Sequence, residues 1–335
     1  MKSEILSTHT PDLFEKAVRR AAELLRAGEV VALPTETVYG LAANALDEKA
    51  VAKIFQIKGR PANNPIIVHV AGNEMAKGCV KNFHLLAEKL SKAFWPGPLT
   101  MVLDRQETIP KIVTAGGETV GVRWPSHPFI QAVIRECDFP LAAPSANLSN
   151  RVSPTNAEHV RKSLGGKIPL IVDGGQSQVG IESTVLDLTV APPRILRPGM
   201  IHAESLAAVV VNIEHRTSNI EHRILRSPGL LNKHYSPKAK LLVLNWRDEE
   251  DLRSQLSTIK HQPSACFIIA HTKIPPGGNF ADVSVIPHDA EAFARAIYAE
   301  LHRCDEAGAE LIVVETPPDS AEWSGITDRL RRAAA

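Results

Sequence analysis

Apolar residues at helical spacing dominate the start of the chain. Thr10 and Pro11 are typical of a helix start, and the apolar stripe that follows them ends at Gly28. The run Val30–Leu33 predicts a buried strand, and Asp47 is expected to cap a second helix. The stripe of the first helix, which is expected to face the core, consists of Leu13, Phe14, Ala17, Val18, Ala21, Leu24 and Leu25.

After the expected strand Ile66–Val70 and the expected helix Phe83–Phe94, short apolar runs separated by Gly and Pro become the main pattern. Such runs are typical of strands, and a few longer stretches between them keep helical spacing. This mixture predicts an α/β (α+β) domain over residues 1–212, built on a twisted mixed sheet. The expected strands are Ile66–Val70, Leu99–Leu103, Thr119–Arg123, Leu170–Val172, Thr184–Leu188 and Arg194–Leu196, and the expected helices are Phe83–Phe94, Pro128–Glu136 and Ala157–Leu164.

A second alternation of strands and helices begins at residue 238 and predicts a small α/β domain over residues 238–335. Residues 213–237 are expected to be a linker. The pentapeptide NIEHR occurs twice near its start, at Asn212–Arg216 and Asn219–Arg223, and we interpret it as a solvated local duplication. The expected elements of the second domain are the strands Leu241–Leu244, Cys266–Ala270, Val283–Ile286 and Leu311–Glu315 and the helices Asp248–Thr258 and Ala290–Cys304.

The composition indicates the broad class of the protein and the cellular compartment expected for it. With 335 residues, 44% of them apolar and 22% charged, the chain has the balance of a soluble globular protein of about two domains. Its four cysteines are far apart and form no CxxC pair, which argues against a zinc knuckle or a disulfide framework and favours a reducing cytoplasm. No apolar run is long enough to span a bilayer, so no membrane association is expected.

The net charge of +1 hides a difference between the two parts of the chain. Residues 1–237 hold 27 Lys and Arg against 22 Asp and Glu, whereas residues 238–335 hold 11 against 15. The first part is therefore mildly basic, and this favours an anionic ligand there.

The segment KGRPANNP, Lys58–Pro65, is the densest cluster of candidate chemistry. Lys58 supplies a compact charge and Arg60 a planar fork, and this combination suits phosphate oxygens. The alternative is a helix C-terminus whose cations complement the helix dipole. Ahead of it, PTETVYG places the hydroxyls of Thr35 and Thr37 after a strand, where α/β sheets often bind ligands, although a polar turn explains them equally well.

Two polar residues stand in otherwise apolar strands. His69 interrupts IIVHV, either as a ligand group or as a hydrogen-bonded core residue. Arg123 ends VGVR, where a buried guanidinium needs an anion beside it. A substrate carboxylate and an internal Asp or Glu both satisfy this requirement, so the sequence leaves the choice open.

The other candidates are hydroxyl, amide or cationic groups in turns and at strand ends. A turn such as PSANLSN, Pro144–Asn150, offers backbone N–H groups and hydroxyls to an anion. The linker holds the aromatic pair His234–Tyr235 between proline-anchored turns, so we expect this segment to be tied down. Together these groups predict a binding site for a polyanion and a small polar ligand. The sequence contains no nucleophile elbow that would argue for covalent catalysis. The groups of the predicted site are Ser145, Asn147, Ser149, Ser183, Thr184 and Arg197.

Seven segments, taken in order, resemble the threonylcarbamoyl-AMP synthases of the long two-domain type. They are PTETVYGLA, KGRPANNPIIVHV, WPGPLT, VGVRWP, PSANLS, ESTVLDL and RPG, followed by the linker SPGLLNKHYSPKA and the terminal DRLRRAA. The resemblance implies a YrdC-like domain with a concave pocket, joined to a Rossmann-like C-terminal domain. Asn150 stands where the family usually has Gly; because asparagine tolerates a left-handed backbone, we expect the turn to be kept.

The resemblance implies an L-threonylcarbamoyladenylate synthase, a nucleotidyltransferase of tRNA modification. Such enzymes join L-threonine, bicarbonate or CO2, and ATP into threonylcarbamoyl-AMP and release pyrophosphate. Partner proteins then transfer the threonylcarbamoyl group to the adenosine next to the anticodon of tRNA. The implied partners are these substrates, the transfer proteins, and tRNA or double-stranded RNA as a direct contact; the implied cofactor is Mg2+, held mainly by ATP without protein ligands.

Site residues follow from the same resemblance. Lys58 and Arg60 are the expected catalytic pair, and Arg123 is expected to bind the threonine carboxylate with both arms of its fork. The choice between Thr35 and Thr37 stays open. The linker segment Ser227–Pro237 is expected to close over the pocket as a lid. The expected threonine ligands are Thr37, His69, Arg123 and Ser183, and the expected ATP ligands are Lys58, Arg60, Asn64, Thr119, Ser145, Asn147, Ser153, Arg197 and Tyr235.

Two other functions compete with this interpretation. A non-catalytic RNA-binding module would use the basic part of the chain on RNA and would release no pyrophosphate. Carbamoyl transfer in metal-centre maturation uses similar domains, but together with zinc fingers, and the absence of CxxC pairs argues against it here.

Overall fold

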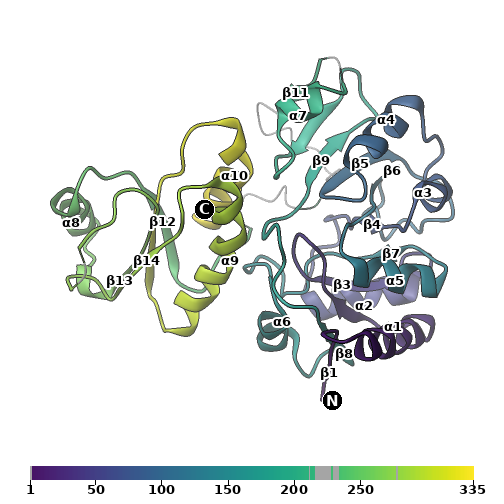
Figure 1. The fold of residues 1–335 in the computed structure, drawn as a ribbon, viewed down its shortest axis with the longest axis horizontal. Helices are drawn as coiled ribbons and strands as arrows, with labels where there is room; N and C mark the ends of the chain where they lie inside the picture. The colour runs from purple at the N-terminus through teal and green to yellow at the C-terminus, as the bar shows by residue number, and fades with distance from the viewer. Residues whose placement is uncertain (1, 211, 216–227, 229–233, 277) are drawn as a thin grey trace. The chain divides into compact units, whose positions relative to one another are not determined.

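The computed structural model describes residues 2–210, 212–215, 228, 234–276 and 278–335 (Figure 1). The chain forms two compact units: Met1–Ser149 with Ser153–Leu230, and Asn150–Val152 with Leu231–Ala335. Each unit is described by itself. The second copy of NIEHR and most of the expected lid lie outside the described residues, and the expected linker boundaries stay a prediction.

The first unit is built on a mixed sheet. Its described strands follow the order β1-β8-β2-β3-β7-β4-β6-β5-β9-β10-β11, with parallel and antiparallel neighbours. The elements are β1 (Glu4–Ser7), α1 (Pro11–Arg26), β2 (Val31–Leu33), β3 (Gly40–Asn44), α2 (Glu48–Lys58), β4 (Val68–His69), α3 (Asn73–Cys79), α4 (Leu85–Phe94), β5 (Leu99–Asp104), β6 (Thr119–Arg123), α5 (Pro128–Cys137), β7 (Leu141–Ala142), α6 (Ala157–Leu164), β8 (Leu170–Asp173), β9 (Thr184–Asp187), β10 (Arg194–Arg197), α7 (Ala203–Ala207) and β11 (Glu214–His215).

Helices cover both faces of the central strands, which explains their continuous apolar runs. In β2, Val31 and Leu33 pack with α1 and α5 on one face, and Ala32 belongs to the larger core on the other. Helices α1 and α5 lie side by side (Figure 1). The rings of Phe14 and Phe129 join them edge to face at 5.2 Å. The buried sheet is therefore a rigid support for the loops at its edges.

The helix starts predicted from the sequence are confirmed. The Thr10 hydroxyl accepts a hydrogen bond from the Leu13 N–H at 3.3 Å, and Asp47 accepts one from the Lys49 N–H at 2.9 Å. One expected core position is wrong: Leu13 is 39% exposed. It stands in the first turn of α1, at the edge of the apolar stripe, where the neighbouring elements do not reach it.

Several short strands were not predicted, and β4 is shorter than expected. The segment GLAAN of β3 has low strand propensity, and it forms because β2 and β7 supply antiparallel partners. β4 keeps only Val68 and His69 of the predicted Ile66–Val70. Its start is diverted because the Ile66 N–H donates to the Val113 carbonyl instead of a ladder partner. Helix α3 was also missed.

The second unit is a small parallel α/β fold, as expected. Its four-stranded sheet has the order β12-β15-β13-β14, and every described pair is parallel. None of the described helices of either unit combines the length and hydrophobicity that crossing a bilayer requires. The main elements are β12 (Lys240–Leu244), α8 (Glu249–Thr258), β13 (Cys266–Ala270), β14 (Asp282–Val285), α9 (Ala290–Glu306), β15 (Leu311–Glu315) and α10 (Ser324–Ala333).

Candidate active site

The candidate site lies where neighbouring strands of the first unit end or begin. β4 and β6 are parallel, and their last residues, His69 and Arg123, are register partners. β5 is antiparallel to β6, so it begins at the same edge, with β9 parallel beside it. The loop after β2 joins this group through the Val179 N–H, which donates to the Glu36 carbonyl at 2.7 Å. Sequence segments that are far apart thus form one site.

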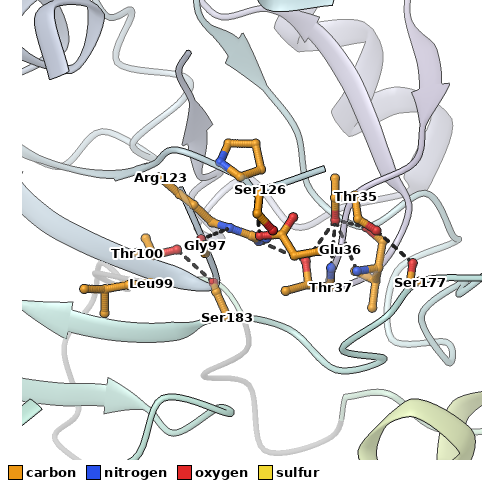
Figure 2. Close-up of polar contacts among 12 residues, drawn as sticks. Thr35, Glu36, Thr37, Gly97, Leu99, Thr100, Arg123, Ser126, Ser177 and Ser183 are labelled. Carbon is orange, nitrogen blue, oxygen red and sulfur yellow. Dashed lines mark hydrogen bonds and ion pairs between the residues drawn. The ribbon is translucent and has the colours of Figure 1, made fainter. Parts of the chain in front are cut away.

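Arg123 is the centre of a buried polar network (Figure 2). Its Nη1 donates to the Thr37 hydroxyl at 2.9 Å and its Nε to the Gly97 carbonyl at 3.2 Å. The Thr35 hydroxyl instead donates to the Val38 carbonyl at 2.6 Å. Thr35 therefore closes the turn, and Thr37 is the threonine of this loop that contacts Arg123.

Glu36 is a member of this buried network that the sequence analysis did not single out. Its Oε1 lies 2.6 Å from Arg123 Nη2 and accepts the Ser126 N–H at 3.0 Å (Figure 2). Burial raises the pKa of Glu36, but Arg123 and the Ser126 N–H outweigh burial and bring the pKa below its usual value. The sequence left two anions open as partners of Arg123, a substrate carboxylate and an internal Asp or Glu. Glu36 is therefore the internal carboxylate.

Two buried polar atoms beside Arg123 have no hydrogen-bond partner among the described residues. They are Glu36 Oε2 and His69 Nδ1. Burial first, and then the charge of Arg123, lowers the pKa of His69 to about 3, so its ring is neutral near pH 7. Because buried polar groups nearly always have partners, this pair indicates a place for a ligand with polar hydrogens or lone pairs.

Ser183 and Arg197 form a second buried group next to the first. The Ser183 hydroxyl is 2.8 Å from the Thr100 hydroxyl and accepts a hydrogen bond from Arg197 Nη2 at 3.1 Å (Figure 2 shows the first contact). Arg197 Nε also donates to the Ser183 carbonyl at 3.1 Å. The Thr184 N–H donates to the Pro98 carbonyl at 3.0 Å, so this group is fixed to the same loop that Arg123 contacts.

Lys58 ends α2 and is buried against the PSAN turn. Its ammonium donates to the carbonyls of Ser145, at 2.5 Å, and Asn147, and lies 3.4 Å from Asn147 Oδ1. Burial, and to a lesser extent Arg60, lowers the pKa of Lys58 well below its usual value. An anion near this ammonium would therefore stabilise its charge, and the turn it holds is the one predicted to bind anions.

Arg60 and Asn64 form the other half of the basic segment. Arg60 Nε donates to the Asn64 carbonyl at 2.9 Å, and its Nη2 donates to Asn64 Oδ1 at 2.7 Å. Ser145, in the facing turn, donates from its hydroxyl to Asn147 Oδ1 at 2.5 Å. Asn150 adopts a φ of +65°, which confirms the left-handed backbone expected where the family has Gly.

The remaining predicted residues are more scattered. Ser153 is buried and donates to Glu182 Oε1 at 2.5 Å. Thr119 begins β6, four residues before Arg123, which places it roughly 13 Å along the strand. Tyr235 belongs to the second unit, where it is buried. The roles expected for these three residues stay predictions.

Gly199, in the RPG segment, has no room for a side chain. A Cβ there would come within 2.5 Å of the Thr184 nitrogen and 2.8 Å of the Ser183 carbonyl carbon. We expect Gly199→Ala to displace Ser183 and to lower the free energy of unfolding by about 1–3 kcal/mol, measured by urea denaturation. The control is Gly78→Ala in α3, where nothing lies within 4 Å; equal losses in both variants would contradict the prediction.

No metal centre is built into the described residues. Among them, no group of three or more His, Cys, Asp and Glu side chains is arranged to hold an ion. The site is rich in cationic and hydroxyl groups, which suit phosphate rather than Mg2+. A protein-held Mg2+ does not fit this donor set, so the ion remains only an expected companion of ATP.

Two family models together match most of the chain. Residues 23–199 match a model described as "Telomere recombination", and residues 201–335 match one described as "Threonylcarbamoyl-AMP synthase, C-terminal domain". A threonylcarbamoyl-AMP synthase of Pyrococcus abyssi is 39% identical over 96% of this chain and 94% of its own length. One of Bacillus subtilis is 40% identical over 98% and 94%.

The comparison with solved structures agrees with these family matches. The crystal structure of P. abyssi Sua5 in complex with L-threonine has a TM-score of 0.91, is 36% identical, and covers 99% of this chain and 98% of that one. E. coli YciO has a TM-score of 0.53 at 24% identity over 59% of this chain and 96% of that one, and this likeness shows the fold alone. The expected YrdC-like fold with an added α/β unit is confirmed.

Proposed function

The chain belongs to the threonylcarbamoyl-AMP synthase family, and from that premise we propose that it condenses L-threonine, bicarbonate or CO2, and ATP to threonylcarbamoyl-AMP and pyrophosphate. The proposed reaction is a nucleotidyl transfer. The solved relative that binds L-threonine supports an amino-acid pocket in this chain.

The buried network around Arg123 is the observation that carries the proposal. A zwitterionic amino acid presents a carboxylate for Arg123 and an ammonium for an acceptor, and Glu36 Oε2 is a buried acceptor beside that guanidinium with no described partner. His69 Nδ1 and the Thr37 hydroxyl add neutral polar groups, which suit the side-chain hydroxyl of threonine. Each polar group of the proposed substrate thus has a candidate partner among these residues.

The reaction needs no covalent intermediate on the protein. The threonine ammonium first gives one proton to water, the free amine attacks CO2, and the nitrogen then gives a second proton to water, which leaves a carbamate. A carbamate oxygen then attacks the α-phosphorus of ATP, and pyrophosphate leaves with its bonding electrons. This chain would contribute position and charge neutralisation, with Lys58, Arg60 and Arg197 as the phosphate-facing cations and Ser145, Asn147 and Ser153 as polar contacts.

The later fate of the product is also part of the proposal. A mixed acyl-phosphate anhydride reacts readily with water, so proteins that transfer its acyl group to tRNA are expected partners. The basic balance of residues 1–237 favours a direct contact with RNA. We expect Mg2+ to arrive with ATP, and we assign it no step. The expected place of action is the cytoplasm.

The test is formation of pyrophosphate and threonylcarbamoyl-AMP by the full chain. We expect both products only when ATP, threonine and bicarbonate are all present, with loss of activity in EDTA and recovery on adding Mg2+. Omission of threonine is the matched control. RNA binding without threonine-dependent pyrophosphate would contradict the proposal and favour a non-catalytic RNA-binding module.

A further inference from the structure

Thr100, in β5, stands beside Arg123 in the sheet of the first unit. The antiparallel register of β5 and β6 pairs Met101 with Val122, and its next position joins Thr100 and Arg123. Residues opposite each other in a ladder point to the same face of a sheet. His69 is the register partner of Arg123 on the other side, in β4. Thr100 therefore lies on the face of the sheet that carries the Arg123 network.

The row continues from Thr100 to the second buried group. Thr100 is the register partner of Val185 in β9, and Val185 is the register partner of Arg197 in β10. The Thr100 hydroxyl lies 2.8 Å from the Ser183 hydroxyl, and both side chains are fully buried (Figure 2). Thr100 therefore connects Arg123, through the sheet, with the group that contains Ser183.

The hydroxyls of Thr100 and Ser183 keep one proton for which the described residues offer no acceptor. Two hydroxyls bring two protons, and their mutual contact uses one of them. The other described contact of the Ser183 hydroxyl is with Arg197 Nη2, which is itself a donor, at 3.1 Å. Because buried donors nearly always have partners, the remaining proton indicates an acceptor atom on a ligand.

The surroundings of Thr100 decide which of the two hydroxyls keeps that proton. The Thr100 methyl group fills the space above Gly121, where a Cβ would come within 3.2 Å of it. Val102 and Val185, its neighbours on this face, are buried and apolar, so they offer no acceptor. A branched side chain has few rotamers, and the Thr100 hydroxyl is therefore held toward Ser183 and donates to it.

We propose that Thr100 is a positioning residue: by donating to the Ser183 hydroxyl, it directs the Ser183 proton toward the carboxylate of the threonine substrate at Arg123. Thr100 and Arg197 then occupy both lone pairs of this hydroxyl, and only its proton is left for the ligand. The inference rests on the proposed function, in which Arg123 binds that carboxylate.

Loss of the Thr100 hydroxyl is expected to weaken threonine binding. The Ser183 hydroxyl is then free to turn its proton away from the substrate, although it still accepts from Arg197. The cations proposed to face the phosphates keep their contacts. The KM for threonine is therefore expected to rise more than kcat falls, and the KM for ATP is expected to change little.

The experiment uses Thr100→Val in the full chain, which removes the hydroxyl and keeps the shape. We expect the KM for threonine, measured as threonine-dependent pyrophosphate, to rise about fivefold, with changes of less than about twofold in kcat and in the KM for ATP. Thr100→Ser keeps the hydroxyl, and its KM for threonine is expected to stay within about twofold of the wild type. The control is Thr114→Val, because the buried Thr114 donates to the Gly117 carbonyl at 2.7 Å; its KM for threonine should be unchanged.

A double-mutant cycle with Ser183→Ala separates positioning from a general structural effect. In the Ser183→Ala chain, Thr100→Val is expected to have no further effect on the KM for threonine. Thermal unfolding shows whether each variant keeps the fold; if Thr100→Val does not fold, Thr100→Ala replaces it with the same expected rise. An unchanged KM for threonine in the folded Val or Ala variant, an equal rise without the Ser183 hydroxyl, or a Thr100→Ser chain as impaired as Thr100→Val would overturn the inference. A wild-type chain that forms no threonylcarbamoyl-AMP would instead overturn the proposed function.

Discussion

Glu36→Ala is expected to remove both stability and threonine binding. The substitution removes the carboxylate whose Oε1 lies 2.6 Å from Arg123 Nη2, and the buried Arg123 guanidinium is left without this anion. Breaking a buried ion pair on one side costs about 3–5 kcal/mol, which urea denaturation would measure. Loss of a charge-assisted acceptor for the ammonium is expected to raise the KM for threonine about 10- to 100-fold.

Two variants separate these effects. Glu36→Gln keeps the shape of the side chain and is expected to fold while still binding threonine weakly. Glu15→Ala is the surface control, because its ion pair with Arg19 is 68% exposed on both sides. If Glu36→Ala bound threonine like the wild type, Glu36 would be a structural partner of Arg123 only.

Acid should weaken the Glu36–Arg123 pair in a predictable direction. The folded pKa of Glu36 lies below its usual 4.5. A lowered carboxyl pKa stabilises the fold above the unfolded pKa, and this contribution is lost as the pH falls through the folded value. The difference in stability between wild type and Glu36→Gln is therefore expected to be constant from pH 6 to 8 and to shrink below about pH 4.5.

Lys58→Met is expected to have the other large effect, on the ATP-dependent step. The variant removes a cation from the proposed phosphate site and leaves the carbonyls of Ser145 and Asn147 without this donor. We expect product formation to fall about 10²- to 10³-fold, because such charge stabilisation acts in a buried site. The free energy of unfolding should fall by about 1–3 kcal/mol for each carbonyl left without a partner.

Lys53→Met is the matched control in the same helix. Lys53 bonds the Gly28 carbonyl and Glu29 at 2.8 Å, and its side chain is 38% exposed. It is expected to keep nearly full activity. Turnover of Lys58→Met close to that of the wild type, measured as threonine-dependent pyrophosphate, would remove Lys58 from the catalytic step and leave it as a support of the PSAN turn.

Local patterns in the sequence determined much of the secondary structure. The cap at Thr10, the strands Cys266–Ala270 and Leu311–Glu315, and the helix Ala157–Leu164 occur where they were predicted. These elements depend on neighbours within a few residues, and capping chemistry and apolar runs record those neighbours directly. The motifs that carry the family resemblance were visible for the same reason.

The partners of the site residues depended on the tertiary structure. Glu36 and Arg123 are far apart in the sequence and meet because the loop after β2 is bonded to the edge where β6 ends. Neither residue's local pattern distinguishes an internal partner from a substrate. The partners of Lys58 also depended on the tertiary structure. Its cationic segment predicted phosphate contacts, whereas its ammonium donates to the carbonyls of Ser145 and Asn147.

The sequence by itself therefore determined the two-part α/β character of this protein, most of its long elements and the residue types of its site. The tertiary structure decided the strand order, the weak strand β3, the Glu36–Arg123 pair and the contact of Thr100 with Ser183. The physical reason is the sequence distance over which each interaction acts. Helix caps and apolar periodicity act within one element, whereas strand pairing, side-chain burial and ion pairs depend on which distant segments the packed core brings together.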